Sequence, residues 1–300
     1  MMARHADPLM RRTPDVVLFH ADCSDGFGAA WAVWKRFPDA QFIPVKHGYP
    51  PPSGLDGRRV LIVDFSYDRP TLLALAERAA GLLILDHHIT AQRALDGLPF
   101  AYFDLKKSGA VLAWEWAHDE PVPWLLQYIQ DKDLWTWALP GSREINAALA
   151  SYPYTFQLWE TLTQERLEAE GRAILRYENE VVEKIAAGAV LQPFHGAMVP
   201  VVYSAVLTSQ IGERLSLGHD FCVIWHDRDG RRYYSLRSRE DGADVAAIAM
   251  RYGGGGHTHA AGFSVPLPVQ TPSPLDVLPS EPEGTRHEAR GARLPNKTQV

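Results

Sequence analysis

The sequence predicts an α/β protein in which a parallel sheet with flanking helices is followed by a smaller α/β domain. Between residues 16 and 88, short apolar runs alternate with helical patterns across short connections. Strands that are joined through helices in this way pair in parallel within one sheet. A second series of strands and helices runs from residue 198 to residue 265. The composition, 46% apolar and 22% charged, is typical of a globular protein.

The first region contains three apolar runs that predict buried strands, because each run is short and rich in Val, Leu and Ile. A turn-rich segment, ADCSDGFG, follows the first run and predicts a loop, and the next segment, AAWAVWKRF, has a helical pattern. An amphipathic pattern predicts a helix between the second and third runs. The predicted strands are residues 16–20, 58–65 and 81–88, the predicted loop is 21–28, and the predicted helices are 29–37, 71–80 and 123–137.

The second region is separated from the first by a long charged and periodic stretch that predicts one or two exposed helices. Its strands are expected at 198–204, 221–227, 231–238 and 260–265, and its helices at 209–217 and 244–252. The composition then changes to Pro, Ser, Glu and Gly, which predicts disorder. We therefore expect a flexible arm (1–14), a first domain (15–160), a helical linker (161–190), a second domain (191–267) and a disordered tail (268–300).

The bulk properties exclude several classes of protein. The net charge of −6 argues against a general duplex-binding surface, although a small phosphorylated substrate stays compatible with it. No apolar run approaches the roughly 18–20 residues of a membrane span, and the first residues lack the apolar segment of a secretory signal. Two cysteines provide no disulfide framework. Together these features predict a cytoplasmic protein without a membrane partner.

Acidic and histidine residues follow all three predicted strands of the first region. His20, Asp22 and Asp25 follow the first strand, Asp64 closes the second, and the third ends in Asp86-His87-His88. The carboxyl ends of parallel strands meet at one edge of a sheet, where ligands gather. Asp131 and Asp133 lie near the end of the helix predicted at 123–137. Each residue alone also fits an ordinary helix cap or turn.

This set of side chains predicts a metal site. Carboxylates suit Mn²⁺ and Mg²⁺, and imidazole shifts the preference toward Mn²⁺, Zn²⁺ or Fe²⁺. We expect two Mn²⁺ ions, since two metals can share one carboxylate, with Mg²⁺ or Co²⁺ as alternatives. A carboxylate that stands alone at a strand end, such as Asp64, suits the bridging position.

The run Gly253–Gly256 and the following His257 form a second candidate binding segment. Successive glycines allow backbone N–H groups to cradle a phosphate, although a flexible connector would have the same composition. Arg237, at the end of the preceding strand, offers a planar fork to the same anion, or else forms a surface ion pair. Ser108 begins a helical pattern and either caps this helix or adds an anion contact.

These motifs together resemble the DHH phosphoesterase superfamily with its C-terminal DHH-associated domain. The resemblance covers about residues 15–266 and rests on four motifs in order, HADCSDG, VDFS, LDHH and IQDKDLW, followed by GGGGHTHAAGF. It implies a parallel-sheet DHH domain with flanking helices and a smaller α/β substrate-binding domain. It also implies that Asp25, Asp64, His87 and Asp131 are metal ligands, with Asp64 in the bridging position. His88 would face the phosphate as a general acid, and Asp86 would orient a histidine.

The first motif departs from the family pattern at one position. Many members have Asp-x-Asp, and the first of these aspartates falls at Cys23 in this sequence. His20 and Asp22 lie close by and are expected to compensate as ligands. Cys23 itself is either a thiolate contact to the metal or a small buried residue.

The resemblance assigns the substrate to the second domain. Arg237, Gly254, Gly255, Gly256 and His257 are expected to bind its far phosphate or base, with Ser108 near the metal site. The implied activity is hydrolysis of phosphodiester or phosphomonoester bonds in nucleotides or short single-stranded oligonucleotides, by attack of a hydroxide held between two metal ions. The alternatives are a single-strand nucleic-acid exonuclease and a nucleotide-binding regulatory protein with a degenerate metal site. A homodimer is an assembly that the sequence allows.

Overall fold

The computed structural model describes residues 13–21 and 23–267. The first region contains a five-stranded sheet, sheet A, with the order β2-β1-β3-β4-β5 and parallel pairing throughout. The chain leaves β1 in one direction to form β2 and then crosses to the other side to form β3. Open α/β sheets bind their ligands at such a reversal point. The strands are β1 (Val16–His20), β2 (Gln41–Val45), β3 (Arg59–Val63), β4 (Gly81–Asp86) and β5 (Ala101–Phe103).

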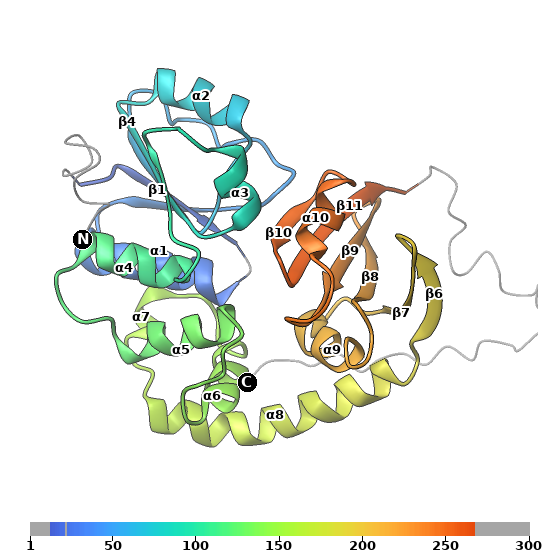
Figure 1. Cartoon of the computed structure of the whole chain (residues 1–300). Helices are drawn as coiled ribbons and strands as arrows, with labels where there is room; N and C mark the ends of the chain where they lie inside the picture. The colour runs from blue at the N-terminus through green and yellow to red at the C-terminus, as the bar shows by residue number, and fades with distance from the viewer. Residues whose placement is uncertain (1–12, 22, 268–300) are drawn as a thin grey trace, which may run out of the picture. The chain divides into compact units, whose positions relative to one another are not determined.

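Sheet A is buried on both faces. Alternate residues of its central strands face opposite sides, and both sets are apolar and pack into a core. In β1, Val17 and Phe19 pack against one core, whereas Val16 and Leu18 pack against the other. Helix α2 covers the second face, and α1, α4 and α5 contribute to the first (Figure 1). The helices are α1 (Ser24–Arg36), α2 (Arg69–Arg78), α3 (Ile89–Ala94), α4 (Gly109–Ala117) and α5 (Trp124–Asp133).

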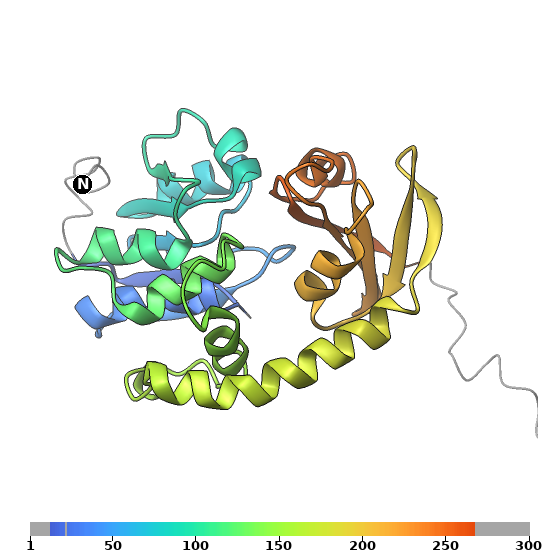
Figure 2. The ribbon, with the colours of Figure 1, turned by 60° about the horizontal axis from the view of Figure 1, so that its bottom comes forward.

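The charged stretch after sheet A is mainly one long helix. Helices α6 (Ser142–Leu149) and α7 (Phe156–Trp159) come first, and α8 (Gln164–Ala186) then runs without interruption (Figure 2). Gly171 of α8 lies so close to α6 that a Cβ atom would meet the carbonyl oxygen of Glu144. None of the helices in the described part of the chain is long and apolar enough to cross a membrane.

The second region contains a six-stranded sheet, sheet B, with the order β10-β11-β9-β8-β7-β6. Strands β7 and β8 pair in parallel, whereas β6–β7, β8–β9 and β10–β11 are antiparallel. Helix α10 packs on one face and α9 on the other. The elements are β6 (Val190–Phe194), β7 (Ala197–Tyr203), α9 (Thr208–Leu215), β8 (Cys222–Arg228), β9 (Arg231–Arg237), α10 (Val245–Met250), β10 (Gly255–His257) and β11 (Ala260–Pro266).

The predicted α/β class and parallel sheet are confirmed, and one local prediction is wrong. Residues 24–28 were expected in a loop, but they form the first turns of α1. Gly26 is required there because it lies against β1, where a Cβ atom would clash with the carbonyl oxygen of His20. The sequence predicts none of the strands β2, β5, β6 and β10. The predictions for residues 1–12, Asp22 and residues 268–300 lie outside the described residues.

Candidate metal centre

Asp64 lies at the reversal point of sheet A, directly after β3, and its carboxylate contacts two groups of side chains. Its backbone is left-handed, with φ 54°, and its side chain is 2% exposed. Oδ1 is 3.1 Å from Nε2 of His87. Oδ2 accepts a hydrogen bond from the Cys23 thiol at 3.5 Å and lies 3.6 Å from Nδ1 of His20. The two oxygens of one carboxylate thus reach two different donor clusters.

The first cluster, called here the carboxylate cluster, consists of Asp25, His87 and Asp133. Nε2 of His87 is 3.4 Å from Oδ2 of Asp25 and 3.6 Å from Oδ2 of Asp133. Asp25 is in the first turn of α1, and its carboxylate also accepts hydrogen bonds from the backbone N–H groups of Gly109 and Ala110 at the start of α4. Three carboxylates, including that of Asp64, therefore surround one imidazole.

The electrostatics of the carboxylate cluster fit a bound cation. Burial raises the pKa of Asp25 well above its usual value, and the nearby carboxylates of Asp133 and Asp64 raise it further. Burial also raises the pKa of Asp133, whose Oδ2 atom is buried and has no hydrogen-bond partner among the described residues. Buried carboxylates without sufficient counter-charge are costly, and a divalent ion supplies that charge. The residues present fit such an ion.

The second cluster, called here the thiol cluster, consists of His20, Cys23 and Asp64. The Cys23 sulfur lies 3.3 Å from Nδ1 of His20. Cys23 is also the N-cap residue of α1, and its sulfur accepts a hydrogen bond from the backbone N–H of Gly26 at 3.1 Å. Cys23 therefore lies beside Asp64, the carboxylate that contacts both clusters.

Asp86 holds the histidine pair that follows it. Its Oδ1 accepts hydrogen bonds from Nδ1 of His88 at 2.7 Å and from the backbone N–H of His87 at 2.7 Å. Its Oδ2 accepts a bond from the hydroxyl of Ser66 at 2.6 Å. With Nδ1–H of His88 committed to Asp86, the tautomer and orientation of the ring are set and Nε2 is left for another partner.

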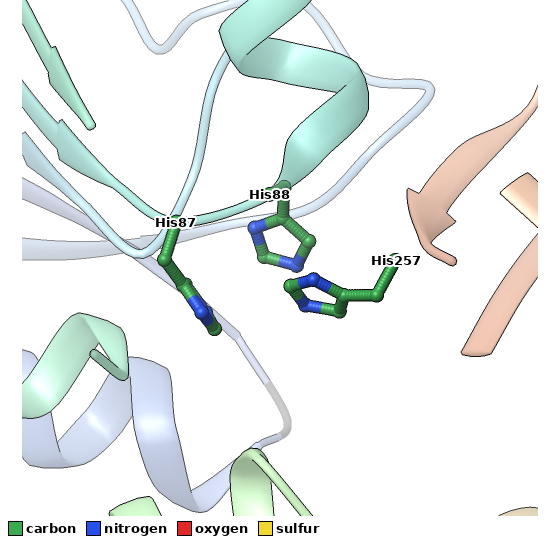
Figure 3. Close-up of side chains that lie close together, drawn as sticks. All are labelled: His87, His88 and His257. Carbon is green, nitrogen blue, oxygen red and sulfur yellow. The ribbon is translucent and has the colours of Figure 1, made fainter. Parts of the chain in front are cut away.

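His257 of β10 lies against the two histidines of the DHH motif (Figure 3). Its ring centroid is 4.6 Å from that of His88, in a stacked arrangement, and 4.9 Å from that of His87. Burial and, to a smaller extent, the neighbouring His88 and His87 lower the pKa of His257 to about 3. At neutral pH this imidazole is therefore uncharged.

The glycine run next to His257 allows close approach of the backbone to neighbouring strands and to Thr90. A Cβ atom at Gly254 would clash with the carbonyl oxygen of Gly262, and one at Gly255 would meet Oγ1 of Thr90 at 2.7 Å. The N–H of Gly256 donates a hydrogen bond to Oγ1 of Thr90 at 3.1 Å. Residues 255–257 form strand β10, and the substrate-binding role of Gly254, Gly255 and Gly256 stays a prediction.

Arg237, at the end of β9, is a cation without a carboxylate partner among the described residues. Its guanidinium donates hydrogen bonds to the hydroxyl of Ser209 at 3.1 Å and to the carbonyl oxygen of Leu236 at 2.9 Å, while Nε has no partner in the described chain. Burial lowers its pKa. Arg237 forms no surface ion pair with any described residue, which removes one of its two predicted roles. The other role, binding of an anion, stays a prediction.

Ser108 caps α4. Its hydroxyl accepts a hydrogen bond from the N–H of Val111 at 3.4 Å, and the side chain is fully buried. The next two N–H groups of α4 donate to Asp25, so the start of this helix binds a carboxylate of the protein. Ser108 is therefore the N-cap residue of α4, whereas its contact with an anion stays a prediction.

Asp131, the expected fourth ligand, points away from the clusters. Its carboxylate accepts hydrogen bonds from the hydroxyl of Thr136 at 2.6 Å and from the N–H groups of Ala138 and Leu139 at 2.8 and 3.1 Å. Asp133, two residues later, joins the carboxylate cluster instead. Residues two apart lie on different sides of a helix.

The spacing of residues along α5 distinguishes Asp133 from Asp131. Asp133 falls four residues after Ile129, whose side chain lies against Gly28 of α1. Residues four apart share one face of a helix. The face of α5 that packs toward α1 therefore also carries Asp133 toward the carboxylate cluster.

Comparison with known proteins places these features in a family, although no family model matches the chain. The uncharacterized protein R106 of Acanthamoeba polyphaga mimivirus is 33% identical over 283 residues, which cover 83% of this chain and 67% of R106. Oligoribonuclease NrnB of Bacillus subtilis (strain 168) is 33% identical over 107 residues, 35% of this chain and 24% of NrnB.

The fold is similar to a solved DHH domain that comes from a member of a family of ribosomal proteins. The TM-score is 0.50 at 13% identity, and the match covers 85% of this chain and 83% of that chain. The ordered motifs, the cluster that they form around Asp64 and these similarities agree. The chain belongs to the DHH phosphoesterase superfamily.

Proposed function

We propose that this DHH phosphohydrolase cleaves phosphodiester or phosphomonoester bonds in nucleotides or short single-stranded oligonucleotides with the help of two divalent ions. The observation that carries the proposal is the position of Asp64, whose two oxygens contact two clusters of ligand-type side chains. Mn²⁺ matches the carboxylate and imidazole donors best, with Mg²⁺ or Co²⁺ as alternatives.

The residues that would hold the ions come from both clusters. Asp25, His87 and Asp133 would bind one ion and His20 and Cys23 the other, with Asp64 shared. In this proposal Asp133 takes the place that the family resemblance assigned to Asp131, because Asp131 is engaged by the loop that follows it. Bound divalent ions would lower the pKa of water and neutralise charge on the phosphoryl oxygens.

The chain's own proton chemistry would come from the Asp86–His88 pair. The carboxylate of Asp86 fixes Nδ1–H of His88 at 2.7 Å and, with the backbone bonds, keeps the ring in one orientation. Asp86 raises the pKa of His88 against the opposing effect of burial, which would lower it. In this proposal Nε2 of His88 gives a proton to the leaving oxygen, and Asp86 is a positioning residue.

A nucleotide is the preferred substrate class because sheet B supplies an uncompensated cation. Arg237 has no carboxylate partner among the described residues, and a phosphate is the anion that a guanidinium fork binds best. His257, which is stacked on His88, would contact the scissile group from the other side. The partial similarity to NrnB, a protein named as an oligoribonuclease, supports short oligonucleotides. The cytoplasmic location and the homodimer stay predictions from the sequence.

A substrate panel tests this function. Full-length protein with Mn²⁺ is assayed on dinucleotides, bisphosphorylated nucleosides, cyclic dinucleotides, a single-stranded 20-mer and polyphosphate. We expect metal-dependent turnover with the highest kcat/KM on one of the three small nucleotides. A preference for the 20-mer would indicate the exonuclease alternative. Tight nucleotide binding without Mn²⁺-stimulated turnover would instead indicate the regulatory alternative.

A further inference from the structure

The thiol cluster differs chemically from the carboxylate cluster although both share Asp64. It offers one imidazole nitrogen, one sulfur and one carboxylate oxygen, and these three atoms lie within 4.8 Å of one another. The sulfur of Cys23 is 3.3 Å from Nδ1 of His20 and 3.5 Å from Oδ2 of Asp64. The carboxylate cluster, in contrast, contains two carboxylates of its own and no sulfur.

Helix capping alone does not account for a cysteine at position 23. Its sulfur accepts the N–H of Gly26 at 3.1 Å, but Ser, Asp and Asn are the preferred residues for this task. Packing does not account for it either. Cys222, the other cysteine, shows what a packing cysteine looks like: it is fully buried among apolar residues, and its thiol faces the carbonyl oxygen of Gly212. Cys23 lies among ligand-type atoms instead.

A second observation concerns the charge around the thiol cluster, where a buried carboxylate oxygen lacks a hydrogen-bond partner among the described residues. The carboxylate cluster, which Asp64 connects to the thiol cluster, contains Asp133, whose Oδ2 atom is buried and has no hydrogen-bond partner among the described residues. His20 is more accessible, with 29% of its side chain exposed, so an ion can reach the thiol cluster from solvent.

We propose that His20, Cys23 and Asp64 form a mixed nitrogen, sulfur and oxygen subsite in which Cys23 binds the metal as a thiolate. Thiolate ligands favour borderline ions such as Zn²⁺ and Co²⁺ over Mg²⁺, whereas carboxylates suit Mn²⁺ and Mg²⁺. The two subsites are therefore unequal, and the enzyme selects a different kind of ion for each. This inference rests on the proposed two-ion function and concerns its metal specificity.

Co²⁺ titration of the metal-free full-length protein tests the proposal without relying on activity. A thiolate bound to Co²⁺ produces a sulfur-to-metal charge-transfer band in the near ultraviolet, which nitrogen and oxygen ligands do not. We expect this band in the wild type and in Cys222→Ala, and its loss in Cys23→Ser. Calorimetry is expected to show Zn²⁺ binding weakened by about 10-fold or more in Cys23→Ser.

Cys23→Asp extends the test, because it restores a carboxylate while removing the sulfur. We expect this variant to lack the band and to shift the ratio of Mg²⁺ to Zn²⁺ affinity toward Mg²⁺ by about 10-fold. An unchanged ratio would argue that the sulfur does not set the ion preference. Far-ultraviolet circular dichroism checks that each variant is folded.

Alkylation of the wild-type protein provides a measurement that needs no variant. With the modified residue located by mass spectrometry, Zn²⁺ is expected to slow alkylation of Cys23 by about 10-fold or more, because a bound thiolate is not free to react. Equal rates with and without Zn²⁺ would count against the proposal.

The outcomes separate this inference from the proposed function. Co²⁺ binding in two equivalents without the sulfur band, or with a band that persists in Cys23→Ser, would overturn the thiolate subsite and leave the two-ion function standing. Absence of any Co²⁺, Mn²⁺ or Zn²⁺ binding to the wild type would overturn both.

Discussion

The two sheets of this protein carry buried or partly buried charges of opposite sign. Among the described residues, the buried carboxylates all belong to the region of sheet A, where Asp25, Asp64 and Asp86 lie close together. The described part of sheet B has no buried carboxylate, and its β9 ends at Arg237, a cation without a carboxylate partner in the described chain. The carboxylates near sheet A would be balanced by a bound cation, and Arg237 of sheet B would be balanced by a bound anion. Under the proposed function, this difference predicts that the region of sheet A binds cations and that sheet B binds an anion.

The sharpest way to break this comparison is to remove the carboxylate that contacts both clusters. Asp64→Asn keeps a residue that tolerates the left-handed backbone but removes the negative charge. We expect kcat with Mn²⁺ to fall by about 10³-fold, because both ions lose a ligand. The measurement is steady-state hydrolysis of the best substrate of the panel, with a thermal melt as the folding control. Activity within about 10-fold of the wild type would contradict a shared ligand.

The neighbouring aspartates of α5 provide a matched pair. Asp133→Asn removes charge from the carboxylate cluster, so kcat is expected to fall by about 10²-fold while the metal-free protein becomes no less stable. Asp131→Asn removes acceptors from the loop over residues 136–139 and is expected to lower the free energy of unfolding by about 1–3 kcal/mol, with a smaller loss of kcat. Urea unfolding and kcat are measured for both. A larger loss of kcat in Asp131→Asn than in Asp133→Asn would indicate that Asp131, and not Asp133, is the metal ligand.

The cation of sheet B is tested by Arg237→Met, which keeps much of the apolar stem. We expect KM to rise by about 10- to 100-fold with little change in kcat, because a charged hydrogen bond to the ground state and the transition state is lost equally. Arg232→Met on the same strand is the control: Arg232 already pairs with Asp227 at 2.7 Å, so its KM should match that of the wild type. An unchanged KM in Arg237→Met would remove the anion site from sheet B.

The smallest effect on the free energy of unfolding is expected at the ion pair between Asp15 and Arg59. Its members pair with each other, whereas among the described residues Oδ2 of Asp133 has no hydrogen-bond partner and Arg237 has no carboxylate partner. The side chain of Arg59 donates hydrogen bonds to Asp15 and lowers the pKa of Asp15 to about 2. A folded-state pKa below the unfolded value of 3.8 means that the stabilisation is present above about pH 4 and is lost as the pH falls toward 2. Asp15→Asn is expected to lower the free energy of unfolding by about 0.5 kcal/mol at neutral pH. Urea unfolding between pH 7 and 2.5 should show this difference shrinking; a constant difference would argue against the pair.

The sequence could predict the centre of sheet A because the residues of β1, β3 and β4 are apolar on both faces. Strand β2 could not be found in the same way: it is an edge strand, contains Pro44, and is half exposed. The start of α1 was wrongly predicted, because Gly26 and Gly28 favour a turn locally. Only the tertiary contacts of these glycines with β1 and α4 show why they occur in a helix.

The sequence predicts the members of the two clusters that follow the strands of sheet A, but it does not predict the member that lies on α5. Asp25, Asp64 and His87 follow from their positions after strands of one parallel sheet. The choice between Asp131 and Asp133 depends on the rotation of α5 about its axis, which the motif alone does not contain. The contact between His257 and His88 joins residues 169 positions apart by sequence number, so no local pattern could reveal it.

The left-handed backbone at Asp64 has a consequence for engineering. An aspartate in this conformation costs about 1 kcal/mol relative to glycine, so the backbone conformation by itself favours glycine at this position. A library of variants selected only for solubility or heat resistance would tend to accept Asp64→Gly and enrich folded molecules that have lost the shared carboxylate. Screens for stabilised forms of this protein therefore need a metal-binding criterion, because at residue 64 thermal selection and functional selection favour different amino acids.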